Sequence, residues 1–110
     1  MRNTSLLKTL ADLGLNEKEA NVYIASLSLG PATILAIAKA SEIKRTTVYS
    51  VVESLKKKGL MVTDIRGFKK FYAPQPPSQL EALLSEKKNA LQSSMPKLLA
   101  LYGLEGSSIS

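Results

Sequence analysis

The stretch Ile43-Lys-Arg-Thr-Thr-Val-Tyr-Ser-Val-Val-Glu-Ser-Leu-Lys-Lys-Lys-Gly-Leu60 decides the fold, because it has two faces of opposite chemistry. Its apolar side chains recur at helical spacing, which predicts a helix over residues 44–58 that packs on a core through Val48, Val51, Val52 and Leu55. At about 100° per residue, the opposite face carries Thr46, Ser50, Glu53 and Lys57, flanked by Thr47, Tyr49 and Ser54. Threonine and tyrosine lose side-chain freedom in a helix, so they are unfavourable on a helix face that contacts only solvent. This face is therefore a candidate binding surface.

The neighbouring elements complete a recognisable architecture. A short helix capped by Thr33 is predicted over 34–40, and a compact turn at 41–43 joins it to the long helix. Two β-prone runs follow, over 60–64 and 68–73, and the turn between them holds Gly67, which predicts a β-hairpin with a basic tip. A short helix, a tight turn, a longer helix and a hairpin in this order make a winged helix-turn-helix.

Two helices are expected before this unit and one after it. The first covers residues 5–13, and Asn16 caps the second, with Glu19 completing a capping-box pattern. Pro77 opens the final helix, whose narrow apolar stripe has no core left to pack on locally, so a second copy of the chain is its expected neighbour. The residues expected to pair two chains are Leu80, Leu84, Leu91, Met95, Leu98 and Tyr102.

The fold class is therefore mainly α with a small β-hairpin (α+β). We expect a winged helix-turn-helix over residues 1–75, a coiled-coil-like dimerisation helix over 76–103, and a flexible tail over 104–110. Pro96 either kinks the final helix or divides it in two, and Gly103 is expected to end it.

Composition excludes several classes of function. The 110 residues include no cysteine and no histidine, which removes thiolate metal sites, imidazole acid–base chemistry and ordinary zinc sites. No glycine-rich phosphate loop is present either. We therefore expect no cofactor, no metal and no catalysis. Because the longest apolar runs are five residues, and Lys8 and Asp12 interrupt the N-terminal apolar segment, we expect a cytoplasmic protein without a membrane partner.

The positive charge is concentrated in the middle third of the chain. The net charge is +6, and the window from Lys39 to Lys70 holds nine basic residues against three acidic ones. Outside this window six basic residues balance six acidic ones. A segregated positive charge of this kind favours a polyanionic partner.

The charged window coincides with the long helix and the hairpin, which in a winged helix contact the major groove and the backbone or minor groove of duplex DNA. Short hydroxyls let a helix approach base edges, and cationic side chains bind phosphates. The candidate DNA-binding residues are Thr33, Lys44, Arg45, Thr46, Thr47, Tyr49, Ser50, Arg66, Lys69 and Lys70. Lys56 to Lys58 are expected to form a solvated helix end, and the aromatic residues Tyr23, Phe68, Phe71 and Tyr72 are expected in the core.

Five short segments carry a resemblance to a known family. They are 13–23 (LGLNEKEANVY), 30–34 (GPATI), 37–39 (IAK), 45–49 (RTTVY) and 58–60 (KGL), followed by Phe71-Tyr-Ala-Pro74. In this order and spacing they resemble the winged-helix domain of TrmB-family transcriptional regulators, over about residues 6–80. The resemblance implies a sequence-specific, more often archaeal, DNA-binding regulator. Full-length members also carry a C-terminal effector domain that binds sugars in some of them. That part is not matched, so no small-molecule effector site is identifiable, and the chain is either a naturally short regulator or a truncated one.

Two other functions remain open from the sequence. A winged helix can bind protein instead of DNA, although such a face more often exposes large apolar groups than hydroxyls beside lysines. RNA binding is a weaker alternative. For DNA, two copies of the long helix about one helical turn apart, or a multiple of it, predict a near-palindromic operator.

Overall fold

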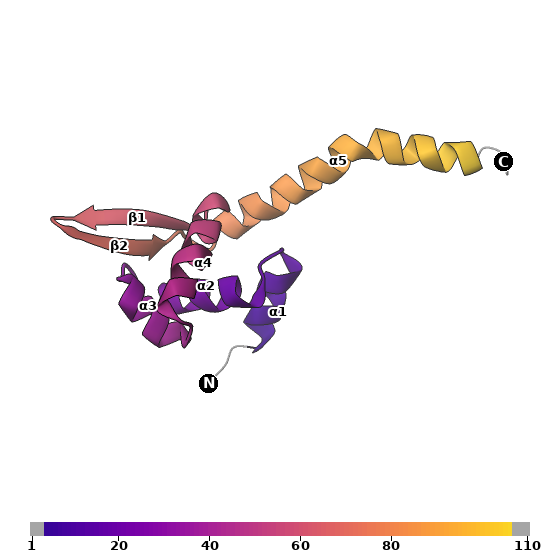
Figure 1. The fold of residues 1–110 in the computed structure, drawn as a ribbon. Coiled ribbons are helices and arrows are strands. Elements are labelled where there is room, and N and C mark those ends of the chain that lie inside the picture. Colours follow the sequence, from indigo (N-terminus) through magenta and orange to yellow (C-terminus); the bar gives the residue numbers. More distant parts are fainter. Residues whose placement is uncertain (1–3, 107–110) are drawn as a thin grey trace.

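The computed structural model of the chain describes residues 4–106, in which a two-stranded hairpin projects from a group of helices (Figure 1). The elements are α1 (Thr4–Asp12), α2 (Glu17–Leu29), α3 (Ile34–Ser41), α4 (Arg45–Lys57), β1 (Met61–Arg66), β2 (Lys69–Pro74) and α5 (Gln79–Gly106). Their order and type confirm the predicted winged helix-turn-helix with a long final helix.

Helix α4 packs on the core through the predicted stripe. Val48, Val52 and Leu55 are fully buried, and the core that they join is formed mainly by α2 and α3. Thr33 caps α3 as predicted, because its hydroxyl accepts a hydrogen bond from the Ala36 amide at 3.2 Å. These contacts fix the direction of α4 against the rest of the domain.

The hairpin, here called the wing (residues 61–74), has a different turn from the one predicted. The register pairs Arg66 with Lys69, so the turn consists of Gly67 and Phe68 and not of residues 65–67. Gly67 has a φ of 62° and Phe68 does not have a positive φ, which matches a two-residue II′ turn with glycine in its first central position. The prediction that Phe68 lies in the core is therefore wrong: it lies at the tip of the wing and is exposed.

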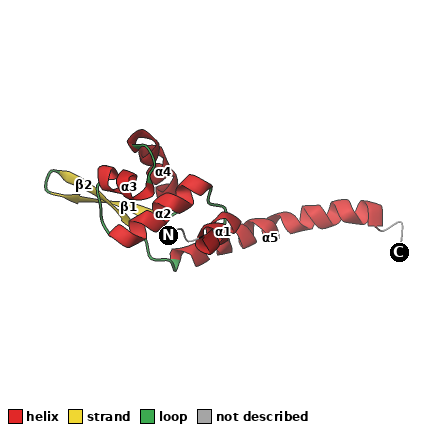
Figure 2. Ribbon diagram, turned by 90° about the horizontal axis from the view of Figure 1, so that it is seen from below, coloured by secondary structure: helices red, strands yellow, loops and turns green. Residues whose placement is uncertain are grey.

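The wing is bound to the helical part along β2. Ala32 and Tyr72 exchange two backbone hydrogen bonds, of 3.0 and 2.7 Å, which add a short third strand segment beside β2. The Tyr23 hydroxyl donates to the Gln75 carbonyl at 2.9 Å. Tyr23 and Tyr72 are buried, as predicted, and Phe71 is half-buried. Figure 2 shows the wing extending beyond the helices from this attachment.

The final helix differs from the prediction in two respects. Its first turns pack on the core of the domain, which was not expected: Leu83 is buried there, and Leu80 packs against the same core. The helix also continues past Gly103 to Gly106, so the start of the expected flexible tail is helical, and residues 107–110 lie outside the described residues. Leu80 thus packs within its own chain and is not free to pair two chains.

Pro96 lies inside α5 without dividing it. The helix is continuous from Gln79 to Gly106, and Figure 1 shows it changing direction along its length as it projects away from the domain. A proline inside a helix removes one backbone donor and crowds the preceding turn, which accounts for a bend without a break.

Within residues 4–106, no helix combines the length and apolarity that crossing a bilayer requires.

Candidate nucleic-acid interface

The outer face of α4 is open to solvent. Thr46, Ser50, Glu53 and Lys57 are all exposed, opposite the buried stripe. Thr47 is half-buried, and its carbonyl accepts a hydrogen bond from the Ser50 hydroxyl at 2.9 Å. Exposed hydroxyl groups therefore line a helix face that no other element of residues 4–106 covers.

The N-terminus of α4 is also exposed to solvent and has no side-chain cap. Lys44 is the N-cap residue, its side chain forms no capping hydrogen bond, and the first turn of the helix contains no acidic residue. Lys44 and Arg45 are both exposed. Unpaired amides at a helix N-terminus and two cations at the same end attract a phosphate group.

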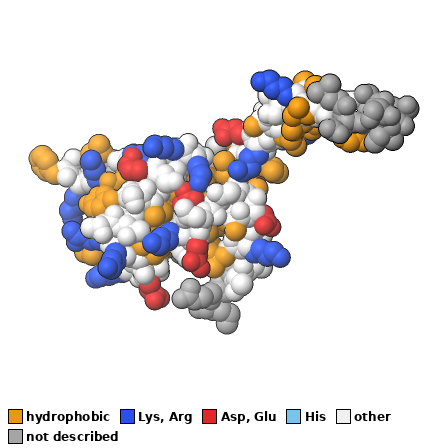
Figure 3. Space-filling model, turned by 45° about the vertical axis from the view of Figure 1, so that its right-hand side comes forward, with side chains coloured by type: hydrophobic (Ala, Val, Ile, Leu, Met, Phe, Trp, Pro, Cys, Tyr) orange, Lys and Arg blue, Asp and Glu red, His pale blue; other side chains and the backbone are white. Residues whose placement is uncertain are grey.

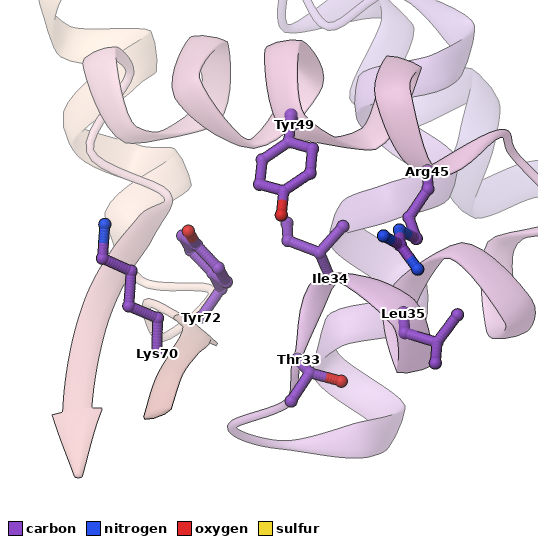
Figure 4. Close-up of a pocket in the computed structure, with 7 residues that line it drawn as sticks. All are labelled: Thr33, Ile34, Leu35, Arg45, Tyr49, Lys70 and Tyr72. Atoms are coloured by element: carbon purple, nitrogen blue, oxygen red, sulfur yellow. The ribbon is translucent and has the colours of Figure 1, made fainter. Parts of the chain in front are cut away.

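A pocket of about 320 Å³ lies between α3, α4 and β2. In Figure 4, Arg45 and Tyr49 extend from α4 toward α3, and Lys70 and Tyr72 come from β2. The pocket brings together four of the predicted residues, Thr33, Arg45, Tyr49 and Lys70, with Ile34, Leu35 and Tyr72 as further lining residues. Two cations from different elements thus face one hollow beside the exposed face of α4.

The basic residues of the wing are divided between its two faces. Arg66 and Lys69 are register partners and share one face, whereas Lys70 lies on the other with Ile65, toward the pocket. The Arg66 guanidinium is 3.0 Å from Asp64 and lies 5.6 Å from the centre of the Phe71 ring. Asp64 therefore offsets part of the charge of Arg66, and Lys69 and Lys70 keep theirs.

Basic side chains are exposed on both the helix-turn-helix and the wing. Figure 3 shows several Lys and Arg side chains along the edge that lies away from α5, and others spread over the rest of the visible face. The exposed cations of the predicted charged window include Lys44 and Arg45 at the start of α4 and Lys69 and Lys70 in the wing.

A partly buried ion pair behind α4 was not predicted. Glu19 in α2 is only 2% exposed, and its carboxylate accepts hydrogen bonds from the Lys58 ammonium at 2.7 and 2.8 Å and from the Ser54 hydroxyl. Lys58 was expected to be solvated, and Ser54 to lie beside the outer face; both instead join the end of α4 to α2. Sequence patterns within α4 do not reveal a partner that lies more than 30 residues away in α2.

The same carboxylate forms the predicted capping box. The Asn16 backbone N–H donates to the Glu19 carboxylate at 2.9 Å, and the Glu19 backbone N–H donates to the side-chain oxygen of Asn16 at 2.8 Å. Burial alone would raise the pKa of Glu19, but the hydrogen bonds from Lys58, Ser54 and Asn16, with the charge of Lys58, hold that pKa below its ordinary value. Glu19 is therefore a charged anchor that positions α4.

Two exposed apolar side chains at this surface were missed. Leu35 lines the pocket, and Phe68 forms the tip of the wing. The signal for Phe68 was available: a glycine at the first position of a two-residue turn places the next residue at the tip and not in a strand.

Comparison with known proteins identifies relatives of the chain. The family model described as "Sugar-specific transcriptional regulator TrmB" matches residues 10–78. The chain is 33% identical over 98 residues to the HTH-type sugar sensing transcriptional regulator TrmBL1 of Pyrococcus furiosus. That match covers 89% of this chain but only 28% of the relative's length.

Solved structures share the fold at lower identity. TrmBL2, described as an archaeal chromatin protein with a novel mode of DNA binding, superimposes with a TM-score of 0.79 at 24% identity, covering 99% of this chain and 43% of that one. A possible transcriptional regulator from Methanosarcina mazei has a TM-score of 0.65 at 16% identity, covering 93% and 89%. A MarR-family regulator from Silicibacter pomeroyi has a TM-score of 0.59 at 14% identity, covering 98% and 82%. These relatives are regulators or chromatin proteins, which agrees with the prediction that the chain is not an enzyme.

Proposed function

The chain belongs to the TrmB family of transcriptional regulators, and from this premise we propose that it binds duplex DNA sequence-specifically as a homodimer. In this proposal residues 1–75 form the DNA-binding unit, with α4 in the major groove and the wing on the backbone or minor groove. Residues 76–103 hold the helix that pairs the two chains, through the exposed stripe that follows Leu83. No small-molecule effector is included, because the sugar sensing in a relative's name belongs to a protein of which this chain spans about a quarter.

The single observation that carries the proposal is the shared surface of α4, its N-terminus and the wing. The hydroxyls of Thr46 and Ser50, the cations Lys44 and Arg45 and the pocket-facing Lys70 all face solvent on neighbouring elements. Hydroxyls suit base edges and cations suit phosphates, so the surface combines the two kinds of contact that specific DNA binding requires.

The pairing of two chains is supported by the uncovered face of α5. Leu84, Leu91 and Leu98 recur every seven residues and are all about half exposed, and Tyr102 is more exposed still. The later turns of the helix project away from the domain, and within residues 4–106 no other element buries this stripe. Two such helices side by side would bury both stripes and present two copies of α4 to a near-palindromic operator.

A salt titration of duplex binding tests the function. If a dimer neutralises about 6–10 phosphates, the logarithm of the binding constant should fall against the logarithm of salt concentration with a slope near −5 to −9. The measurement is fluorescence anisotropy of a labelled duplex selected from a random pool. A flat salt response, or no affinity for any duplex, would contradict the proposal and favour a protein partner.

Replacing Arg45 with alanine is expected to weaken binding to the selected duplex by about 1–3 kcal/mol, because Arg45 stands at the open end of α4 above the pocket. Lys8→Ala is the matched control, since Lys8 is an exposed cation in α1, outside the charged window. Anisotropy titrations of both variants with the selected duplex and an unrelated duplex separate specific from non-specific loss. Unchanged discrimination between the two duplexes in Arg45→Ala would remove Arg45 from base readout.

A further inference from the structure

Phe68 occupies an unusual place for a large apolar side chain. Its relative exposure is 108%, the largest among the exposed hydrophobic residues of the described chain. In Figure 3 a hydrophobic group forms the outermost end of the wing. Apolar groups at such a position gain nothing from the fold, because no core contact compensates for their contact with water.

The backbone places Phe68 in a two-residue turn at this tip. The ladder of β1 and β2 is paired up to Arg66 and Lys69, so Gly67 and Phe68 form the shortest common hairpin connection. Gly67, with a φ of 62°, makes this II′ turn possible without strain. Phe68 is therefore presented by a fixed turn, at a small entropic cost on binding compared with a residue in a long loop.

The surroundings of Phe68 are cationic. Arg66, Lys69 and Lys70 all lie within two residues of it and are exposed, and Ile65 adds a second exposed apolar group on the pocket-facing side. An apolar tip on a basic strand pair complements a surface with phosphates on the outside and apolar ring faces within. Duplex DNA offers this arrangement where a base step is partly opened, because the ring faces are stacked behind the polar base edges of the groove.

We propose that Phe68 inserts as a wedge between base pairs in the minor groove and bends the duplex, an inference that rests on the DNA-binding function proposed above. Apolar side chains that partly unstack a base step kink DNA toward the major groove by roughly 20–90°. The cations beside Phe68 would bind the phosphates that flank the opened step. Flexible pyrimidine–purine steps are cheapest to unstack, so the wing selects them without hydrogen bonds to bases.

The experiment compares the wild-type protein with Phe68→Ala and Phe68→Leu on the duplex selected from a random pool. 2-Aminopurine substituted along the duplex reports unstacking by its fluorescence, and electrophoretic mobility of circularly permuted fragments reports bending. Phe68→Ala is expected to lose both signals and to bind about tenfold more weakly with an unchanged salt slope, because no phosphate contact is removed. Phe68→Leu, which keeps an apolar wedge, should retain most of the bend. Val62→Ala is the matched control, since Val62 is exposed in the same wing but lies far from its tip.

The outcomes separate this inference from the proposed function. If the wild-type protein binds the duplex but Phe68→Ala unstacks and bends it equally, the wedge is overturned and DNA binding stands. If the wild-type protein binds no duplex, both fall together. If Phe68→Ala lowers the oligomeric state in sedimentation velocity, Phe68 contacts a second chain and the wedge is again overturned.

Discussion

Leu91→Glu is expected to turn the protein from a dimer into monomers and to lower its affinity for a two-half-site duplex by about a hundredfold. Linked half-sites bind more tightly than single ones because the second contact is intramolecular, and a monomer loses this gain. Sedimentation velocity measures the mass, and anisotropy with one-half-site and two-half-site duplexes measures the loss. The one-half-site affinity should change little.

The expected effect follows from the position of Leu91 on α5. Its side chain is 53% exposed and lies at the centre of the stripe, seven residues from both Leu84 and Leu98. A carboxylate at this position would face apolar groups of the partner helix, with Lys88, three residues earlier in the same stripe, as a cation beside it. Removing the carboxylate from water still costs several kcal/mol when the charge is retained. Dissociation avoids that cost.

Asn89→Glu is the matched control for this change. Asn89 is exposed on the same helix but lies about 160° around it from Leu91, so it adds the same charge outside the proposed interface. It should remain dimeric and keep its affinity for the two-half-site duplex. A Leu91→Glu protein with the mass of a dimer would place the interface elsewhere, and equal dissociation of both variants would attribute the effect to net charge.

The elements that were predicted well are those fixed by local patterns. The valine and leucine spacing of α4, the Thr33 cap and the Asn16–Glu19 capping box each involve residues within one or two turns of each other, and all three are present in the structure. Local periodicity and capping chemistry are strong signals at this range. The charged window from Lys39 to Lys70 could also be predicted from the sequence, because α4 and the wing are consecutive along the chain and the window covers both.

The features that were missed depend on contacts between residues far apart in the sequence, or on the exact position of the hairpin turn. The Glu19 carboxylate meets Ser54 and Lys58 across 35 and 39 residues, a separation at which no pattern in one helix reports the partner. Leu83 is buried because the chain returns after the wing to the core of the domain. Phe68 was misplaced because a shift of the hairpin turn moves a residue from a strand to the tip.

Replacing Glu19 with glutamine is expected to lower the free energy of unfolding at neutral pH by about 2 kcal/mol. The amide keeps an acceptor for the Asn16 capping hydrogen bond, but the Lys58 ammonium, whose side chain is 29% exposed, loses its counter-charge. Urea unfolding followed by circular dichroism measures the change. Glu17→Gln is the matched control, because Glu17 is an exposed acid in the same first turn of α2. Equal destabilisation by the two substitutions would mean that helix-dipole charge, and not the buried pair, accounts for the effect.

The pH dependence of this difference has a definite sign. Because the folded-state pKa of Glu19 is held below its ordinary value of 4.5, the ionised carboxylate contributes stability that is present above that value and is lost as the pH falls through the folded-state pKa. The wild-type protein should therefore lose stability in this acidic window while Glu19→Gln does not lose that contribution, and the two unfolding curves should converge. A difference between them that stays constant or grows on acidification would show that Glu19 is not bound to Lys58 as a charged group. Since Lys58 follows directly after the last residue of α4, the same acidic window should also loosen the anchoring of this helix, measurable as lower amide protection factors at its C-terminal end, with each exchange rate compared with its intrinsic rate at the same pH.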